Sequence, residues 1–139
     1  MPHNKIVLDT ETLITTLLSP QNLSEELKVA ITKAQNNNNL YIAAITLWQI
    51  AKLVQQKQLH VYARLSDFLN NITNIEGLNV IGLNSNIAAE STTLPEELNS
   101  DSVNAIIVAS TREIAGTLIS KNPKIIELAE QGYLKLIAG

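Results

Sequence analysis

Short apolar runs alternate with amphipathic stretches along this chain. The runs are of strand length and each contains Ile, Leu or Val; they lie at residues 5–8, 40–43, 78–83, 117–120 and 133–137. Between most of them, apolar residues recur at spacings of three and four, as in a helix with one buried face. Because strands that alternate with helices form parallel sheets covered by helices, the pattern predicts an α/β fold with a mainly parallel central sheet.

The ends of the predicted helices carry their own signals. We expect the first helix over residues 10–18, where Ser19-Pro20 stops it. Ser24 can cap the second, whose first turn carries Glu25 and Glu26, a favourable placement of negative charge. The Asn-rich run at 36–39 then forms a polar turn.

Five further helices and one loop complete the prediction. Thr46 is expected to cap the third helix, and Asn122-Pro123 places a cap and a first-turn proline before the last one, which Gly132 can end. The others are expected at residues 65–72, 85–91 and 103–110, with a polar loop at 92–100. The helix at 103–110 is apolar on nearly every side and should be buried.

The composition excludes several kinds of covalent link, catalysis and metal site. The 139 residues suit one domain, 1–139, and include no cysteine, which excludes disulfides, thiol catalysis and Cys-ligated zinc. With only His3 and His60, a multi-histidine zinc centre is excluded too. No run approaches the roughly 18–20 apolar residues of a membrane span, and the apolar run near the start is too short for a signal peptide. We therefore expect a cytoplasmic protein without membrane contact.

Net charge argues against a protein that depends on overall attraction to nucleic acid. The formal charge is −3 and the pI is about 5.3, whereas proteins that neutralise phosphates are usually basic, at least locally. Lys52, Lys57 and Arg64 can form a small basic patch, or they can be an ordinary solvated helix face, which is the commoner case.

Polar side chains gather where the predicted parallel sheet should place a functional site. In open parallel sheets, functional residues lie beyond the carboxyl ends of the strands. The residues expected at that edge are Asp9, Gln49, Asp101, Asn104, Ser120 and Asn122. Each also has an ordinary structural interpretation, because Asp and Asn often cap helices and Gln is common in a first helical turn.

Four segments resemble those of PIN domains of the VapC toxin kind. The first is IVLDTETLITTLL, in which a strand ends in Asp-Thr before a helix. The second, AAITLWQIAKLVQQKQL, is similar to a family segment built around Ser-Leu-Trp-Glu-Ile-Ala. The third, NSDSVNAIIVAS, resembles an Asp-Pro-Phe-Asp segment that runs into a buried helix, and TLISKNPKI resembles a Leu-Val-Thr-x-Asp strand end. They occur in family order across almost the whole chain.

The resemblance implies a fold, an activity and partners. The fold is a three-layer α/β/α sandwich, and the activity is endoribonuclease cleavage with Mg²⁺ or Mn²⁺ held by three or four carboxylates. Such ions prefer charged oxygen ligands, generate hydroxide and neutralise the scissile phosphate. The family's toxins also dimerise and are inhibited by a small antitoxin, so a homodimer, an antitoxin-like partner and RNA are the implied partners.

Most of the positions that are acidic in the family are not acidic in this sequence. Asp9 matches the first acid, but Gln49, Asn104 and Asn122 stand at the second, third and fourth. Asp101 matches an acid three residues before the third. The remaining pocket positions are Thr10, Glu11, Thr46 and Ser120. Ser120 stands where the family has a small hydroxyl residue, and Glu11 stands where the family often has a histidine. Three acid-to-amide changes remove most of the charge that binds a divalent ion.

Two hypotheses follow, and a third is set aside. The first is a PIN-like protein whose catalysis is weakened or lost and which acts by protein binding. The alternative is an active Mg²⁺- or Mn²⁺-dependent ribonuclease with Asp9 and Asp101 as metal ligands, aided by Glu11 if that side chain points inward. A phosphorylated receiver domain fails because the mid-chain strand is followed by Asn84 rather than an aspartate.

Overall fold

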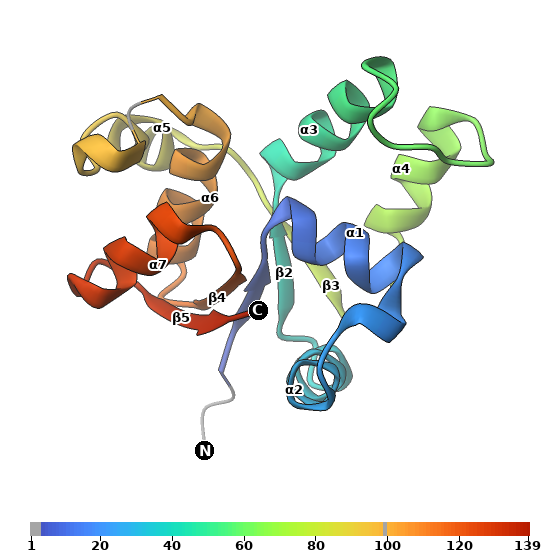
Figure 1. Ribbon diagram of the computed structural model, residues 1–139, viewed down its shortest axis with the longest axis horizontal. Helices are drawn as coiled ribbons and strands as arrows, with labels where there is room; N and C mark the ends of the chain where they lie inside the picture. Colours follow the sequence, from blue (N-terminus) through green and yellow to red (C-terminus); the bar gives the residue numbers. More distant parts are fainter. Residues whose placement is uncertain (1–3, 99) are drawn as a thin grey trace.

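A five-stranded sheet forms the centre of the molecule. The computed structural model describes residues 4–98 and 100–139, so His3 and residue 99 of the predicted loop lie outside the described residues. The strands are β1 (Ile6–Leu8), β2 (Leu40–Ala43), β3 (Leu78–Ile81), β4 (Thr117–Ser120) and β5 (Lys135–Ala138). Their order is β3-β2-β1-β4-β5, and every neighbouring pair is parallel (Figure 1).

The helices follow the strands in the alternation that the sequence predicts. The α-helices are α1 (Thr10–Leu18), α2 (Glu25–Asn36), α3 (Ala44–Gln55), α4 (Leu65–Thr73), α5 (Ser85–Ser91), α6 (Ser102–Glu113) and α7 (Pro123–Glu130). Two short 3-10 helices, η1 (Pro20–Asn22) and η2 (Glu96–Leu98), lie in the connections. β1 and β2 run almost directly into α1 and α3, which places the first turns of both helices at the carboxyl edge of the sheet.

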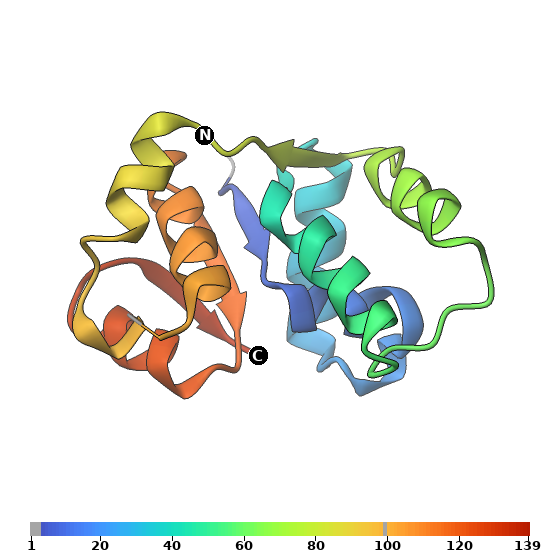
Figure 2. The same cartoon turned by 90° about the horizontal axis from the view of Figure 1, so that it is seen from above.

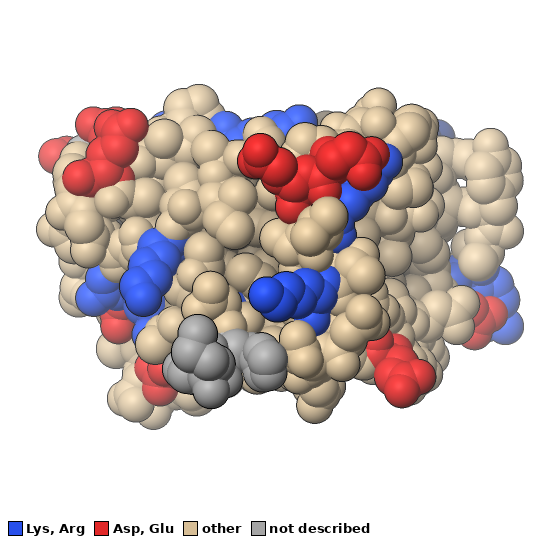
Figure 3. Space-filling view, turned by 90° about the horizontal axis from the view of Figure 1, so that it is seen from below, with Lys and Arg blue, Asp and Glu red and all other residues tan. Residues whose placement is uncertain are grey.

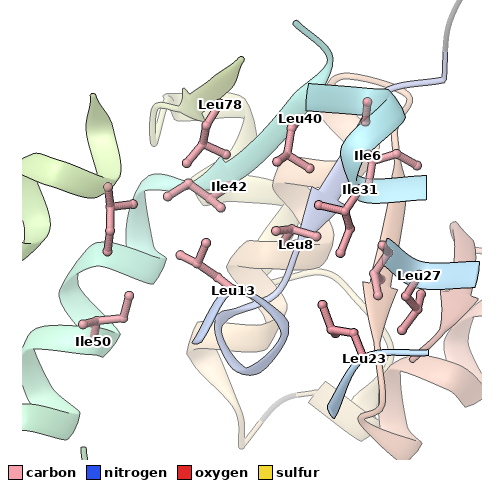
Figure 4. Packing of buried hydrophobic residues seen from close by; sticks show 13 residues of the cluster. Ile6, Leu8, Leu13, Leu23, Leu27, Ile31, Leu40, Ile42, Ile50 and Leu78 are labelled. Atoms are coloured by element: carbon pink, nitrogen blue, oxygen red, sulfur yellow. The ribbon is translucent and has the colours of Figure 1, made fainter. Parts of the chain in front are cut away.

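Alternating side chains divide the core into two clusters, one on each face of the sheet. Leu8 and Ile42 belong to the first cluster, while their neighbours Val7 and Ala43 belong to the second. The first cluster is completed by residues of α1, α2, α3 and α4, among them Leu13, Leu27, Ile31, Ile50 and Ile72 (Figure 4). The second is completed by residues of α5, α6 and α7, including Ile87, Ile107, Val108, Ile125 and Leu128.

The architecture is therefore the predicted three-layer α/β/α sandwich. Figure 2 shows the helices of the second cluster on one side of β1 and α3 and α4 on the other. The helix predicted at 103–110 is buried as expected, because α6 buries consecutive residues from Ile107 to Thr111.

One helix start was predicted wrongly. Thr46 does not cap α3; the helix begins two residues earlier at Ala44, with Ala43 in the capping position and no side-chain cap. Thr46 is instead fully buried within the first turn. The helix can begin without a polar cap because it follows β2 directly, so the strand fixes its first residues. Gln49 consequently lies in the second turn rather than the first.

Other element ends differ by small amounts from the predictions. The strand expected at 78–83 ends at Ile81, and the one expected at 133–137 is displaced to Lys135–Ala138. Gly132 follows α7 with a φ of 89°, a left-handed conformation that suits glycine and ends the helix as predicted. The Ser24 cap is also confirmed, since its hydroxyl accepts a hydrogen bond from the Leu27 N–H at 3.2 Å.

Candidate functional site at the carboxyl edge of the sheet

Asp9 lies between the last residue of β1 and the first of α1. Its side chain is buried, and Oδ1 accepts a 2.9 Å hydrogen bond from the Thr12 N–H. Its backbone N–H donates to the carbonyl of Ile119 in β4 at 3.4 Å. Asp9 is therefore a helix cap held at the centre of the sheet edge, and one of its two carboxylate oxygens is already engaged.

Ser120 and Asn122 lie at the same edge, because β4 pairs with β1 with Ile119 opposite Leu8. Ser120 is buried, and its hydroxyl accepts a hydrogen bond from the Asn122 N–H at 3.1 Å. Oδ1 of Asn122 accepts from the Lys124 N–H at 2.9 Å, which confirms Asn122 as the cap of α7. Its amide oxygen thus caps the first turn of α7.

Buried threonine hydroxyls connect the start of α1 to its neighbours. Thr10 donates a hydrogen bond to the hydroxyl of Thr46 at 3.2 Å, which joins α1 to α3. Thr12 donates to the Ile119 carbonyl at 3.3 Å, which joins α1 to β4. Thr12 was missed as a site residue, since nothing in the helical periodicity separates a buried threonine from an exposed one.

Asp101 and Asn104 form a closely bonded pair at the start of α6. Oδ1 of Asp101 accepts from the backbone N–H of Asn104 at 3.2 Å, and Oδ2 accepts from its side-chain Nδ2 at 2.7 Å. Both carboxylate oxygens therefore receive a hydrogen bond from the same residue. Asp101 caps α6, as its position in the sequence predicts.

Gln49 presents an unpaired acceptor. Its Oε1 is buried and has no hydrogen-bond partner among the residues that the structure describes. Buried polar atoms are nearly always paired, so a water or another donor is expected beside this oxygen. Gln49 lies three residues after Thr46 on α3, and α3 packs against both α1 and α6.

Glu11 is exposed in the first turn of α1. Within the described part of the chain no hydrogen bond or ion pair engages its carboxylate. Direct contacts and strand register therefore bring together Asp9, Thr10, Thr46, Ser120 and Asn122. The Asp101–Asn104 pair is a second group, and no hydrogen bond between described residues joins it to the first.

Comparison with known families assigns the fold. The family model of the PIN domain matches residues 6–131. The chain belongs to the PIN domain family. Among curated proteins no match was found.

Solved structures of similar PIN domains share this fold at low sequence identity. FitAB bound to an IR36 DNA fragment gives a TM-score of 0.62 at 15% identity, covering 95% of this chain and 93% of that one. FitAcB from Neisseria gonorrhoeae gives 0.62 at 16% identity, with 96% of each chain covered. DNA-bound VapBC from Salmonella typhimurium gives 0.61 at 16%, covering 96% of this chain and 97% of that one.

The donor set of this PIN domain does not fit a divalent metal well. Three of its candidate positions hold neutral amides, and among the residues described here no group of three His, Cys, Asp or Glu side chains lies close enough to hold an ion. Both carboxylate oxygens of Asp101 accept hydrogen bonds from Asn104, and one oxygen of Asp9 accepts a hydrogen bond from the backbone N–H of Thr12. Mg²⁺ loses water reluctantly and needs charged oxygens to replace it, so the residues present favour a metal-free edge.

The surface of the PIN domain carries charges of both signs. On the face shown in Figure 3, acidic and basic side chains are interspersed. None of the helices in the described part of the chain has the length and apolar character needed to cross a membrane.

Proposed function

We propose that this protein is a PIN domain, formed by residues 1–139 and related to VapC-type toxins, whose metal-dependent cleavage is weakened or lost and which acts by binding other proteins. The observation that carries the proposal is the Asp101–Asn104 pair, in which an amide donates to the carboxylate oxygen that would otherwise be open to a cation. Asp9 is the one other carboxylate among the six residues expected at the sheet edge.

Loss of charge is the physical reason for lost catalysis. Clustered carboxylates repel one another until a cation binds, which makes such a cluster selective for metal. Amides of nearly the same shape remove that repulsion, so the edge is stable without a cation. Without a bound ion, neither hydroxide generation nor neutralisation of the scissile phosphate is available at neutral pH.

Protein binding is supported by the exposed edge strand β3. Val80 of β3 is 38% exposed and Leu83, just after it, is 54% exposed. Because β3 is the first strand in the sheet order, the backbone groups along its outer side are free of strand partners. We propose this edge as the contact of a homodimer. An antitoxin-like protein is proposed as a second partner, in line with the FitAB and VapBC assemblies that share the fold.

One observation favours the alternative, an active Mg²⁺- or Mn²⁺-dependent endoribonuclease that acts on RNA through Asp9 and Asp101. The unpaired Oε1 of Gln49 is a buried oxygen ligand without a partner among described residues. It is neutral, however, and a water molecule satisfies it at less cost than a dehydrated Mg²⁺ ion. Glu11 would add a third carboxylate only by turning from its exposed position.

Calorimetric titration with Mn²⁺ tests the proposal, with Asp9→Ala as the matched variant. We expect no saturable binding at millimolar Mn²⁺ in either protein. Saturable binding that disappears in Asp9→Ala would overturn the proposal in favour of the ribonuclease. RNA cleavage assays with Asp101→Ala and Glu11→Ala would then follow, with Asp9→Ala controlling for contaminating nucleases.

A further inference from the structure

Charge is unevenly distributed along the chain despite its net acidity. Between Glu26 and Asp67 there is no Asp or Glu, although the rest of the chain carries all 13 of them. The same stretch holds five of the ten Lys and Arg residues, together with His60. A protein that is acidic overall thus has one stretch of sequence with a net positive charge, and phosphate attraction depends on such local charge.

The cationic residues of α3 and of the segment from 56 to 64 have no acidic partner. Within the described ranges, the ion pairs are Lys28–Glu25 and Arg112–Glu90. Lys52 donates only to Oε1 of Gln55, and Lys57 and Arg64 are exposed. These three charges are therefore available to a ligand. In Figures 1 and 2 the segment that joins α3 to α4 projects at one end of the molecule.

Two exposed aromatic rings belong to the same two segments as these charges. Tyr62 is 97% exposed, and its ring contacts that of His60 edge-on, with centroids 4.7 Å apart. Trp48 is 53% exposed, and Nζ of Lys52 lies 5.8 Å from the centre of its ring. They are the two most exposed of the five Phe, Trp and Tyr residues. The Tyr62 ring contributes almost nothing to the core at this exposure, so its packing does not explain its presence, whereas Trp48 is about half buried.

The segment that carries Tyr62 is fixed at both ends. The N–H groups of Gln58 and Leu59 both donate to the carbonyl of Leu53 in α3, and Leu59 packs against the first core cluster. At the other end the carbonyl of Arg64 accepts the first hydrogen bond of α4, from Phe68. Because the backbone is held on either side, Tyr62 and His60 are presented to solvent from a short, anchored connection.

We propose that α3 and residues 56–64 bind single-stranded nucleic acid, through exposed side chains other than the candidate residues of the carboxyl edge. Lys52, Lys57 and Arg64 contact phosphates, while unstacked bases stack on Tyr62 and Trp48. Alternating cations and exposed rings are the combination that binds single strands with little sequence preference, since every base has a flat face. A duplex buries its base faces and cannot use the rings. An acidic peptide would use the cations without needing two rings.

This proposal does not rest on the proposed protein-binding function, because it requires neither a metal nor an edge strand. The test is fluorescence anisotropy in EDTA at low salt, with labelled oligouridylate and oligothymidylate of about ten nucleotides. Oligothymidylate resists contaminating ribonucleases. A duplex of the same length and a polyglutamate peptide serve as competitors.

The expected result is a dissociation constant of about 10⁻⁴–10⁻⁶ M for both oligomers. Tyr62→Ala should weaken binding about tenfold, the effect of losing one stacked base, while Tyr62→Phe should retain it. Lys57→Glu/Arg64→Glu should weaken binding further and reduce its salt dependence. Lys33→Glu/Lys135→Glu makes the same change of charge at exposed positions outside the site and should have a much smaller effect.

Several outcomes overturn the proposal. The first is an absence of saturable binding to either oligomer, and the second is an equal loss in both charge-reversal variants. Retained affinity in Tyr62→Ala would refute the stacking contact. Stronger competition by the duplex would exclude single-strand selectivity, and stronger competition by polyglutamate would identify the surface as a protein contact.

Discussion

Asn104 donates a hydrogen bond to each carboxylate oxygen of Asp101: its Nδ2 donates to Oδ2 at 2.7 Å and its backbone N–H donates to Oδ1 at 3.2 Å. An aspartate at position 104 would put a second carboxylate where that donor now lies. The pair would then require a cation or a proton to remain in contact. The amide thus satisfies this carboxylate oxygen without any ion.

Asn104→Asp should therefore destabilise the protein in the absence of metal. We expect a loss of about 1 kcal/mol in the free energy of unfolding, since a charge-assisted hydrogen bond disappears and the favourable charge at a helix start offsets only part of it. Urea denaturation in EDTA measures the effect. Asn104→Ala, which removes the donor without adding charge, should lose less. Equal stability of Asn104→Asp and the unsubstituted protein would show that the amide has no such role.

Restoring three acids together should create a metal site. In Gln49→Glu/Asn104→Asp/Asn122→Asp, Mn²⁺ should raise the melting temperature. At a Mn²⁺ concentration one hundred times the dissociation constant, the free energy of unfolding should increase by about 2.7 kcal/mol. The unsubstituted protein should melt at the same temperature in Mn²⁺ and in EDTA. Adding Asp9→Ala to the triple variant should remove the stabilisation. A metal-dependent shift in the unsubstituted protein itself would contradict the inferred loss of the site.

Much of the fold was predictable because local and tertiary signals agree. The bounds of α1, β2, α5 and β4 follow from apolar runs and capping residues, as predicted. Thr46 was misjudged as a cap because a threonine before an apolar helix has the same local signature whether it is exposed or buried. Its hydroxyl accepts a hydrogen bond from Thr10, which lies 36 residues earlier in the chain, and no local pattern contains that contact.

The candidate site was only partly predictable for a similar reason. The edge position of Asp9, Ser120 and Asn122 follows from strand ends in a parallel sheet. The hydrogen bonds that occupy Asp101 depend on a side-chain rotamer three residues away, and the unpaired oxygen of Gln49 depends on how α3 packs. Sequence spacing constrains neither of these.

The Thr10–Thr46 contact should show strong coupling. Thr46→Val removes the acceptor of a buried hydroxyl and should cost about 1–3 kcal/mol of unfolding free energy. In Thr10→Val/Thr46→Val no hydroxyl remains unpaired, so the double variant should be more stable than the sum of the single effects. A double-mutant cycle by denaturant unfolding measures this coupling, and simple additivity would argue against the contact.

Asn122 should behave as a helix cap. Asn122→Ala removes the acceptor for the Lys124 N–H and should cost about 1 kcal/mol, whereas Asn122→Asp keeps an equivalent oxygen and should change stability by less than about 0.5 kcal/mol. Ser24→Ala removes the cap of α2 and should lower the free energy of unfolding by a similar amount. If Asn122→Ala were as stable as the unsubstituted protein, the cap would contribute nothing to folding.

The β3 edge should control self-association if it is the homodimer contact. Leu83→Glu places a charge on an exposed apolar position, so it should leave the monomer folded while weakening the dimer at least tenfold, about 1.4 kcal/mol. Sedimentation equilibrium over a range of concentrations gives the dissociation constant. Val29→Glu is the matched control, because Val29 is an apolar residue that is 64% exposed and belongs to α2 rather than to β3. A monomer at all concentrations in the unsubstituted protein, or equal weakening by both substitutions, would exclude β3 as the contact.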